Sequence, residues 1–328
     1  MPELRYIDAI NQAHYEEMVR DERVLVMGED VGRKGGVFGA TMGLLEKFGE
    51  DRVIDTPLAE SSIAGVAVGM ACNGLLPIAE FQFADFIHPA FDQIVSEAAR
   101  MRYRSNNAFS CPVVFRAPYG ASHGTALYHS QSIEAFYTHV PGLKVVAPST
   151  PYDAKGMLKA AIRDPDPVLF LEHKRMYRVV KGEVPDGDYT VPIGPSAVRR
   201  QGKDLSVFAY GWMLHESLAA ADAAAAAEGI EAEVVDVRTL APLDRDTILA
   251  SVAKTNRALI VYEDNTFMGY GAEIAALIAE HAFSDLDAPV MRVAAPDVPG
   301  VPFAKPLEEW FTVTKDKIAA AMRKLAAY

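Results

Sequence analysis

The chain has 328 residues, half of them hydrophobic, which is enough to fill two separate cores. Its 32 lysines and arginines stand against 44 aspartates and glutamates, and the resulting charge of −12 disfavours nucleic acid and anionic membranes as partners. The charged N-terminal residues contain no apolar leader, and no stretch reaches the roughly 18 apolar residues of a membrane span. We therefore expect a two-domain cytoplasmic protein.

The first part of the chain alternates between strand-like and helix-like segments. Short β-rich runs lie at 23–30, 76–83, 112–118, 143–149 and 167–173. Helix-like stretches lie at 57–71, 91–104 and 150–164, and in the last of these Thr150 can cap the helix with Pro151 at its first position. This alternation predicts an α/β domain with a parallel sheet covered by helices.

A composition break at 181–197, rich in proline, glycine and aspartate, predicts a linker between a domain at 1–180 and a smaller α/β domain at 198–328. In the second domain, strand-like runs lie at 205–211, 232–240, 257–264 and 289–296, and helix-like runs at 215–229 and 272–283. The alanine-rich stretch 215–229 has high helix propensity, so we interpret it as a packing helix that Gly229 closes.

Several local motifs carry weak chemical signals. The glycine-rich stretch 28–36 follows a strand but lacks the spacing of a phosphate loop, so a turn is the favoured interpretation. His123 and His129 have no third ligand nearby, which argues against zinc; a histidine here can exchange protons or simply bond to the nearby hydroxyl groups. Cys72 and Cys111 fit no redox or metal pattern, and we assign them no role.

Glu60 lies at the edge of a run of small apolar residues. With Thr56 as cap and Pro57 as first residue of a helix at 57–71, an acid in the first turn is favoured by the helix dipole alone. Gly65 and Gly69 leave one helix face nearly bare, which predicts close packing against another helix, across a subunit boundary. Desolvation in such a seam disfavours ionisation, so Glu60 can hold or share a proton.

Long ordered blocks give the whole chain a family resemblance. They include GEDVGRKGGVF, DRVIDTPLAE, EFQFADFIHPAFDQI, MRYRSNN, YHSQSIEAF, STPYDAKG, FLEHKRMYR and LDAPVMRVAAPDVP. In these blocks the chain resembles the β subunits of the E1 component of 2-oxo acid dehydrogenase complexes, which depend on thiamin diphosphate. The resemblance implies a pyrimidine-binding domain followed by a transketolase C-terminal domain.

The resemblance also implies roles for individual residues. Glu60 matches the family acid that hydrogen-bonds the cofactor's aminopyrimidine ring, and Gln82 and Phe86 match positions beside that ring. Phe86 stands where some relatives carry tyrosine, so any phenol hydrogen bond is absent. Leu58 falls at a cofactor-contact position. His129 matches a histidine proposed to assist 2-oxo acid binding and acylation of the lipoyl group, and on that ground we prefer it to His123.

Metal sites and partners are implied in the same way. The chain lacks the G-D-G motif that binds diphosphate and Mg²⁺ in such enzymes, so an E1 α subunit is expected to supply them in an α2β2 heterotetramer, with the chain alone inactive. Ala161, Asp164 and Asp166 match a family K⁺ site, although a plain DPD turn is an equally good interpretation of 164–166. The E2 acyltransferase is the second implied partner.

The blocks resemble branched-chain E1 β chains more than pyruvate-type ones. Branched-chain 2-oxo acids are therefore the favoured substrates and pyruvate the alternative, since one methylene changes specificity by only about 1 to 3 kcal/mol. A non-catalytic scaffold and a self-sufficient transketolase-like enzyme remain alternatives of other classes. The retention of Glu60, Gln82 and His129 argues against the scaffold, and the missing diphosphate motif argues against the self-sufficient enzyme.

Overall fold

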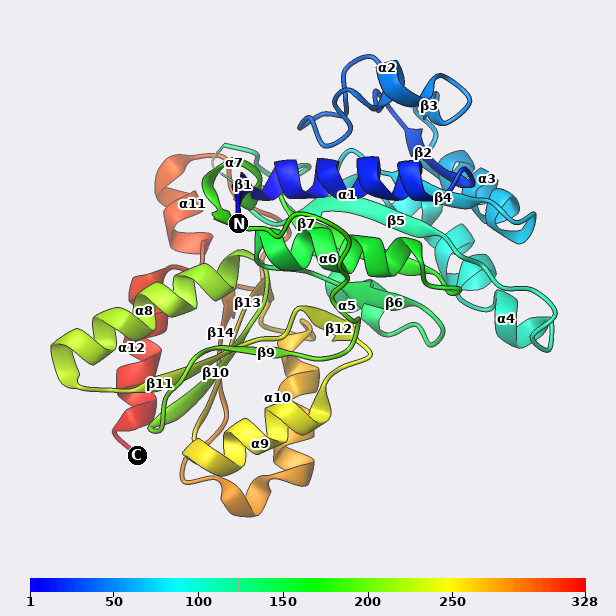
Figure 1. The fold of residues 1–328 in the computed structure, drawn as a ribbon. Coiled ribbons are helices and arrows are strands. Elements are labelled where there is room, and N and C mark those ends of the chain that lie inside the picture. The colour runs from blue at the N-terminus through cyan, green and yellow to red at the C-terminus, as the bar shows by residue number, and fades with distance from the viewer. Residues whose placement is uncertain (123) are drawn as a thin grey trace. The chain divides into compact units, whose positions relative to one another are not determined.

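The chain divides into two units, each with its own sheet (Figure 1). The computed structural model describes residues 1–122 and 124–328. The first unit comprises Met1–Tyr119 and Phe136–Ile193, and the second comprises Gly120–Ala135 and Gly194–Tyr328. The segment Gly120–Ala135 therefore belongs to the second unit, although the chain of the first unit surrounds it in sequence.

The sheet of the first unit consists of parallel strands in the order β6-β7-β5-β4-β2-β3. The strands are β2 (Val24–Gly28), β3 (Val53–Asp55), β4 (Leu76–Glu80), β5 (Val114–Tyr119), β6 (Lys144–Val146) and β7 (Val168–His173). Every residue of β2, β5 and β7 is buried, as expected for parallel strands covered on both faces. Gly28 pairs with Asp55 and with Glu80, so these three strands end at one edge.

Helices α1 (Tyr6–Arg20) and α6 (Pro151–Ile162) lie side by side in the first unit (Figure 1). Thr150 caps α6 as predicted, because its hydroxyl oxygen accepts a hydrogen bond from the Asp153 N–H. Lys155 and Lys159 are buried between the helices, and both ammonium groups bind the Glu16 carboxylate at 2.6 Å. Pairing of this kind is what permits lysine to be buried.

The helix-like stretch predicted at 91–104 is helical over most of its length but is not a single α-helix. A short 3₁₀ turn at His88–Ala90 is followed by a π-helix at Gln93–Ala98 and then by α4 (Met101–Arg104). The Ala99 N–H bonds to the Ile94 carbonyl at 3.0 Å, five residues back, so the helix is wider here than an α-helix. The apolar pattern indicated helical structure but could not show this change of hydrogen-bond register.

The segment that follows the first sheet belongs to the first unit as far as Ile193. Strand β8 (Lys181–Glu183) pairs antiparallel with β1 (Glu3–Arg5). Asp188 binds the guanidinium of Arg163 at 2.6 Å and the ammonium of Lys159 at 2.6 Å. The remaining helices of this unit are α2 (Leu44–Phe48), α3 (Glu60–Cys72), α5 (Glu134–Thr138, whose first two residues belong to the second unit) and α7 (Met176–Val179).

The second unit has a five-stranded sheet in the order β14-β13-β10-β11-β9, in which β9 alone is antiparallel. Its strands are β9 (Ala197–Arg200), β10 (Leu205–Ala209), β11 (Ala232–Asp236), β13 (Ala258–Asn265) and β14 (Met291–Ala295), with a short β12 (Thr239–Ala241) besides. Its helices are α8 (Trp212–Glu228), α9 (Arg245–Thr255), α10 (Gly271–His281), α11 (Lys305–Phe311) and α12 (Lys315–Ala326).

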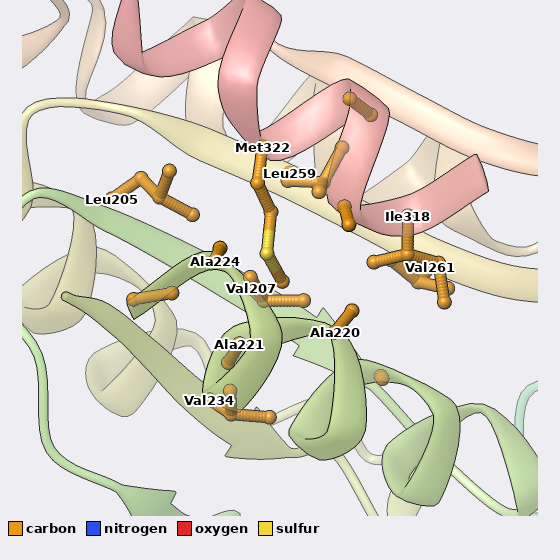
Figure 2. Close-up of a cluster of buried hydrophobic side chains, with 14 of the residues drawn as sticks. Leu205, Val207, Ala220, Ala221, Ala224, Val234, Leu259, Val261, Ile318 and Met322 are labelled. Atoms are coloured by element: carbon orange, nitrogen blue, oxygen red, sulfur yellow. The ribbon is translucent and has the colours of Figure 1, made fainter. Parts of the chain in front are cut away.

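The alanine-rich stretch of α8 is a packing helix, as predicted. Ala220, Ala221 and Ala224 are fully buried, and Gly229 closes the helix in the left-handed conformation. Figure 2 shows Met322 of α12 reaching between these alanines and the strands of the sheet. Small side chains on α8 thus leave room for a large one from α12. Among the described residues, no helix is both long and apolar enough to cross a membrane.

Candidate active site

Glu60 is the first residue of α3, where the helix dipole favours an acid. The predicted start at Pro57 with Thr56 as cap is wrong, because the cap position is held by Ala59. The Thr56 N–H bonds to the Gly28 carbonyl at 2.9 Å, which keeps the chain extended beyond β3. The buried Thr56 hydroxyl oxygen has no hydrogen-bond partner among the described residues.

Two further acids lie near Glu60, at the end of strand β2. Glu29 is nearly buried, and its pKa is raised by burial and by the negative charges of Glu60 and Asp30. Sequence reasoning missed these acids, because it treated 28–36 only as a possible phosphate loop. The available signal was their position directly after a buried parallel strand, where ligands of α/β sheets bind.

The glycine-rich loop at 28–36 forms a turn beside the carboxylates of Asp55 and Glu80. This agrees with the interpretation of the loop as a turn rather than a phosphate loop. Asp55 accepts hydrogen bonds from the Gly32 N–H at 2.6 Å and from the Arg33 N–H at 3.4 Å. Gly36 has a φ of 78°, and a Cβ placed on it would come within 2.9 Å of Glu80 Oε1. Two of the loop amides that a phosphate could use are therefore already bound to a side chain of this protein.

Gln82 and Phe86 follow strand β4 in the same unit. The Gln82 amide nitrogen lies 3.5 Å from Asp30 Oδ2, which links Gln82 to the acids beside Glu60. Phe86 ends the 3₁₀ turn at Ala84–Phe86 and meets Phe83 edge to face, with 5.7 Å between ring centroids. Phe83 meets Phe38 in the same way at 5.5 Å, so an aromatic row adjoins the polar residues.

Leu58 lies in the loop that precedes α3 and is 78% exposed. Val66 and Gly69, on the outer side of α3, are also exposed, and a Cβ on Gly69 would meet nothing within 4 Å in this chain. Gly65 instead contacts Gln93 of the same chain, where a Cβ would lie 3.2 Å from the Gln93 amide oxygen. The part of the small-residue face that contains Val66 and Gly69, which we call the open strip of α3, is thus exposed to solvent in this chain.

A buried charge cluster joins the neighbouring strands β4, β5 and β7. The Arg116 guanidinium donates to Glu80 at 2.5 Å and to both oxygens of Glu172 at 2.6 and 2.7 Å. The Tyr177 hydroxyl also donates to Glu172, at 2.6 Å. Burial raises the pKa of Glu80 although Arg116 opposes this, and the pKa of Arg116 is raised by its two acidic neighbours.

His129 belongs to the other unit. It lies in Gly120–Ala135, and its side chain is exposed. His123 lies outside the described residues. The structure therefore brings Glu60 and Gln82 together through Glu29 and Asp30 in the first unit, and it assigns His129 to the second.

The segment proposed for K⁺ follows α6. Lys144 binds both carboxylate oxygens of Asp164 at 2.6 Å, and Arg102 binds Asp166 at 2.5 Å. The Ala161 carbonyl accepts the Asp164 N–H at 3.2 Å. The two acidic side chains thus already have cationic partners, which leaves backbone oxygens as the available ligands. Among the described residues, no group of three or more His, Cys, Asp or Glu could hold a metal ion.

Known proteins match the chain over nearly its whole length. The transketolase pyrimidine-binding domain matches residues 3–180, and the transketolase C-terminal domain matches residues 194–318. The chain is 58% identical to the 2-oxoisovalerate dehydrogenase subunit beta of Bacillus subtilis, over 100% of both chains. It is 50% identical to the pyruvate dehydrogenase E1 component subunit beta of the same organism, over 99% of both.

A solved structure shares the fold as well. A split-gene transketolase, described as an inactive β4 tetramer, aligns with a TM-score of 0.80 and 25% identity, over 99% of this chain and 98% of that one. The predicted α/β class and the resemblance are therefore confirmed. The chain belongs to the family of E1 β subunits of 2-oxo acid dehydrogenase complexes, a thiamin-diphosphate-dependent enzyme family with transketolase-type domains.

Proposed function

We propose that this chain is the β subunit of an E1 component that decarboxylates branched-chain 2-oxo acids and passes the acyl group to a lipoyl group on E2. Its working form is a cytoplasmic α2β2 heterotetramer with an E1 α subunit. The observation that carries this proposal is the position of Glu60, at the start of α3 and near Glu29, whose neighbour Asp30 contacts the Gln82 amide. The higher identity to the 2-oxoisovalerate enzyme, 58% against 50% for the pyruvate enzyme, favours branched substrates.

The residues of the first unit fit an aminopyrimidine ring. Such a ring needs an acid at one ring nitrogen, hydrogen-bonding groups at its edge and an apolar surface against its face. Glu60, the Gln82 amide and the Phe86 ring supply these three kinds of group. The buried Thr56 hydroxyl, which has no partner among the described residues, adds a donor that a bound group could use.

The reaction balances as an acyl transfer coupled to reduction of a disulfide. The 2-oxo acid loses CO₂, its acyl group forms a thioester with one lipoyl sulfur, and the other sulfur becomes a thiol that carries the acid's proton. Thiamin diphosphate, when bound, supplies the carbon centre that accepts the electron pair released with CO₂.

The side chains of this chain bind, orient and move protons. Glu60 exchanges a proton with the ring nitrogen, and burial together with the charge of Glu60 raises the pKa of the neighbouring Glu29. Asp30 orients the Gln82 amide. Leu58 and the open strip of α3 at Val66 and Gly69 face the α subunit, which would cover them and exclude water from the ring.

The α subunit is proposed to hold the diphosphate and Mg²⁺. This agrees with the glycine-rich loop of this chain, whose amides are bound to Asp55. A K⁺ ion, if held after α6, would use backbone oxygens near Ala161, Asp164 and Asp166, since both carboxylates have cationic partners.

The test is co-expression of this chain with the α subunit of its own organism. Decarboxylation of 3-methyl-2-oxobutanoate and of pyruvate would be measured with and without thiamin diphosphate, and with each chain alone as control. We expect activity only with both chains and a higher kcat/KM for the branched substrate. A preference for pyruvate would shift the assignment to a pyruvate dehydrogenase, and activity of this chain alone would refute the shared site.

A further inference from the structure

The loop that carries His129 is built into the C-terminal part of the molecule. In sequence, residues 120–135 lie inside the stretch that matches the pyrimidine-binding domain, 3–180. In the structure, Gly120–Ala135, which we call the His129 loop, belongs to the second unit. The predicted bounds assign this histidine to the domain at 1–180, whereas in the structure it belongs to the second unit.

The His129 loop is closed at its base and folded on itself. The Gly120 N–H bonds to the Gln131 carbonyl at 3.0 Å and so joins the two ends. The Thr125 hydroxyl donates to the Ser122 carbonyl at 2.7 Å and lies 2.5 Å from the Ser130 hydroxyl. Ser130, the neighbour of His129, is buried, so the buried Ser130 side chain fixes the backbone beside the exposed histidine.

The tip of the loop contacts the segment around helix α11. The Gly124 N–H donates to the carboxylate of Glu308, a buried residue of α11, at 3.1 Å. Leu127 lies against Gly300, where an added Cβ would come within 2.0 Å of Leu127 Cδ1. Ala121 packs against the small apolar cluster that contains Phe311. These contacts fix the part of the loop that precedes His129.

The part that follows His129 is fixed by a buried carboxyl group. The Tyr210 hydroxyl, directly after strand β10, donates to Glu134 Oε1 at 2.8 Å, and both residues are buried. Burial and the nearby acids Asp264 and Glu263 raise the pKa of Glu134 to about 8. A carboxyl group that holds its proton at neutral pH is buried at a lower cost than an ionised one.

We propose that Glu134, Tyr210 and Glu308 are positioning residues that hold the His129 loop on the second unit and thereby set the place from which His129 acts. The inference rests on the proposed role of His129 in the reaction with the 2-oxo acid and the lipoyl group. The C-terminal unit is then a part of the catalytic machinery.

Two single substitutions with matched controls test the anchors in the enzyme assembled with its α subunit. Tyr210→Phe removes one buried hydroxyl, and Tyr270→Phe removes the hydroxyl of a neighbouring buried ring that bonds to the Leu240 carbonyl instead. Glu308→Ala removes the carboxylate bound to the loop, and Glu309→Ala removes an exposed one from the same helix.

We expect Tyr210→Phe and Glu308→Ala to lower acyl transfer to lipoamide by between about 10- and 100-fold, since small displacements of a reacting group have effects of this size. The Kd for thiamin diphosphate and the activities of both controls should stay unchanged. In a His129→Ala background, Tyr210→Phe should have no further effect, because it acts through the lost imidazole. That last comparison separates positioning from general damage to the fold.

The outcomes distinguish the inference from the proposed function. If His129→Ala impairs acyl transfer while Tyr210→Phe and Glu308→Ala match their controls, the positioning role is refuted and the role of His129 stands. If Tyr210→Phe lowers the rate equally with and without His129, the positioning role is also refuted. If His129→Ala itself changes nothing, the proposed role of His129 fails and the inference falls with it.

Discussion

The cluster of Glu80, Arg116 and Glu172 predicts that two chemically identical substitutions have unequal costs. Glu172 accepts three hydrogen bonds, two from Arg116 and one from Tyr177, shared between its two carboxylate oxygens. Glu80 accepts one from Arg116, at a single oxygen. Replacing either acid by glutamine keeps its size, removes its charge and turns one oxygen into a donor.

In Glu172→Gln, whichever way the amide faces, at least one donor loses its acceptor. A charge-assisted hydrogen bond contributes about 1.5 to 3 kcal/mol, and an unsatisfied buried donor costs about 1 to 3 kcal/mol more. We expect a loss of about 3 kcal/mol, at the lower end of that sum, because Glu80 remains hydrogen-bonded to Arg116 as a second acidic partner. In Glu80→Gln the amide oxygen keeps the one bond, so the cost should stay below about 1 kcal/mol.

Hydrogen–deuterium exchange of peptides from β5 in the full chain measures this difference, because it reports on the strand that carries Arg116. A loss of stability of about 3 kcal/mol relative to wild type corresponds to exchange that is about 100-fold faster in Glu172→Gln. Equal acceleration in the two variants, or a larger effect in Glu80→Gln, would refute the reasoning.

Three further predictions concern stability. Met322→Ala should destabilise the second unit by about 2 to 5 kcal/mol, because it leaves a cavity in a buried cluster. Unfolding can be followed by the fluorescence of Trp212 and Trp310, which both lie in that unit. A loss of stability under about 1 kcal/mol would show that the core closes around the cavity. Since the pKa of Glu134 is raised from 4.5 to about 8, its carboxyl holds a proton longer in the folded state, so stability falls as pH rises from 5 to 8. Glu134→Gln should flatten that slope in a Tm-against-pH series, and an unchanged slope would contradict the assignment. Thr150→Ala should lower the free energy of unfolding by about 1 kcal/mol, measured by chemical denaturation, because it removes the cap bond to the Asp153 N–H. An unchanged free energy of unfolding would show that this bond contributes nothing.

The main strands were predictable because each is a short run of mostly apolar residues. β2, β5 and β7 are buried along their whole length, and this is the pattern that the sequence showed. The cap of α6 at Thr150 was predictable for a local reason, since cap and first residue are adjacent in sequence. Local signals thus predicted what local interactions decide.

Longer-range interactions decided the rest. The start of α3 moved from Pro57 to Glu60 because the Thr56 backbone pairs with Gly28, a residue 28 positions away. The acids Glu29 and Asp30 join the site through the parallel pairing of β2 with its neighbours, and their position directly after a buried strand was the local sign of it. The assignment of His129 to the second unit likewise depends on distant contacts of its loop. Glu134 of the loop bonds to Tyr210, and Gly124 bonds to Glu308.

The central claim is that Glu60 exchanges a proton with the cofactor ring. The most direct measurement is the rate of hydrogen–deuterium exchange at C2 of thiamin diphosphate bound to the assembled enzyme, compared between wild type and Glu60→Gln. We predict that the substitution slows this exchange by at least about 100-fold while thiamin diphosphate still binds, as for the loss of a general acid–base group. An exchange rate equal to wild type, with the cofactor bound, would contradict the account.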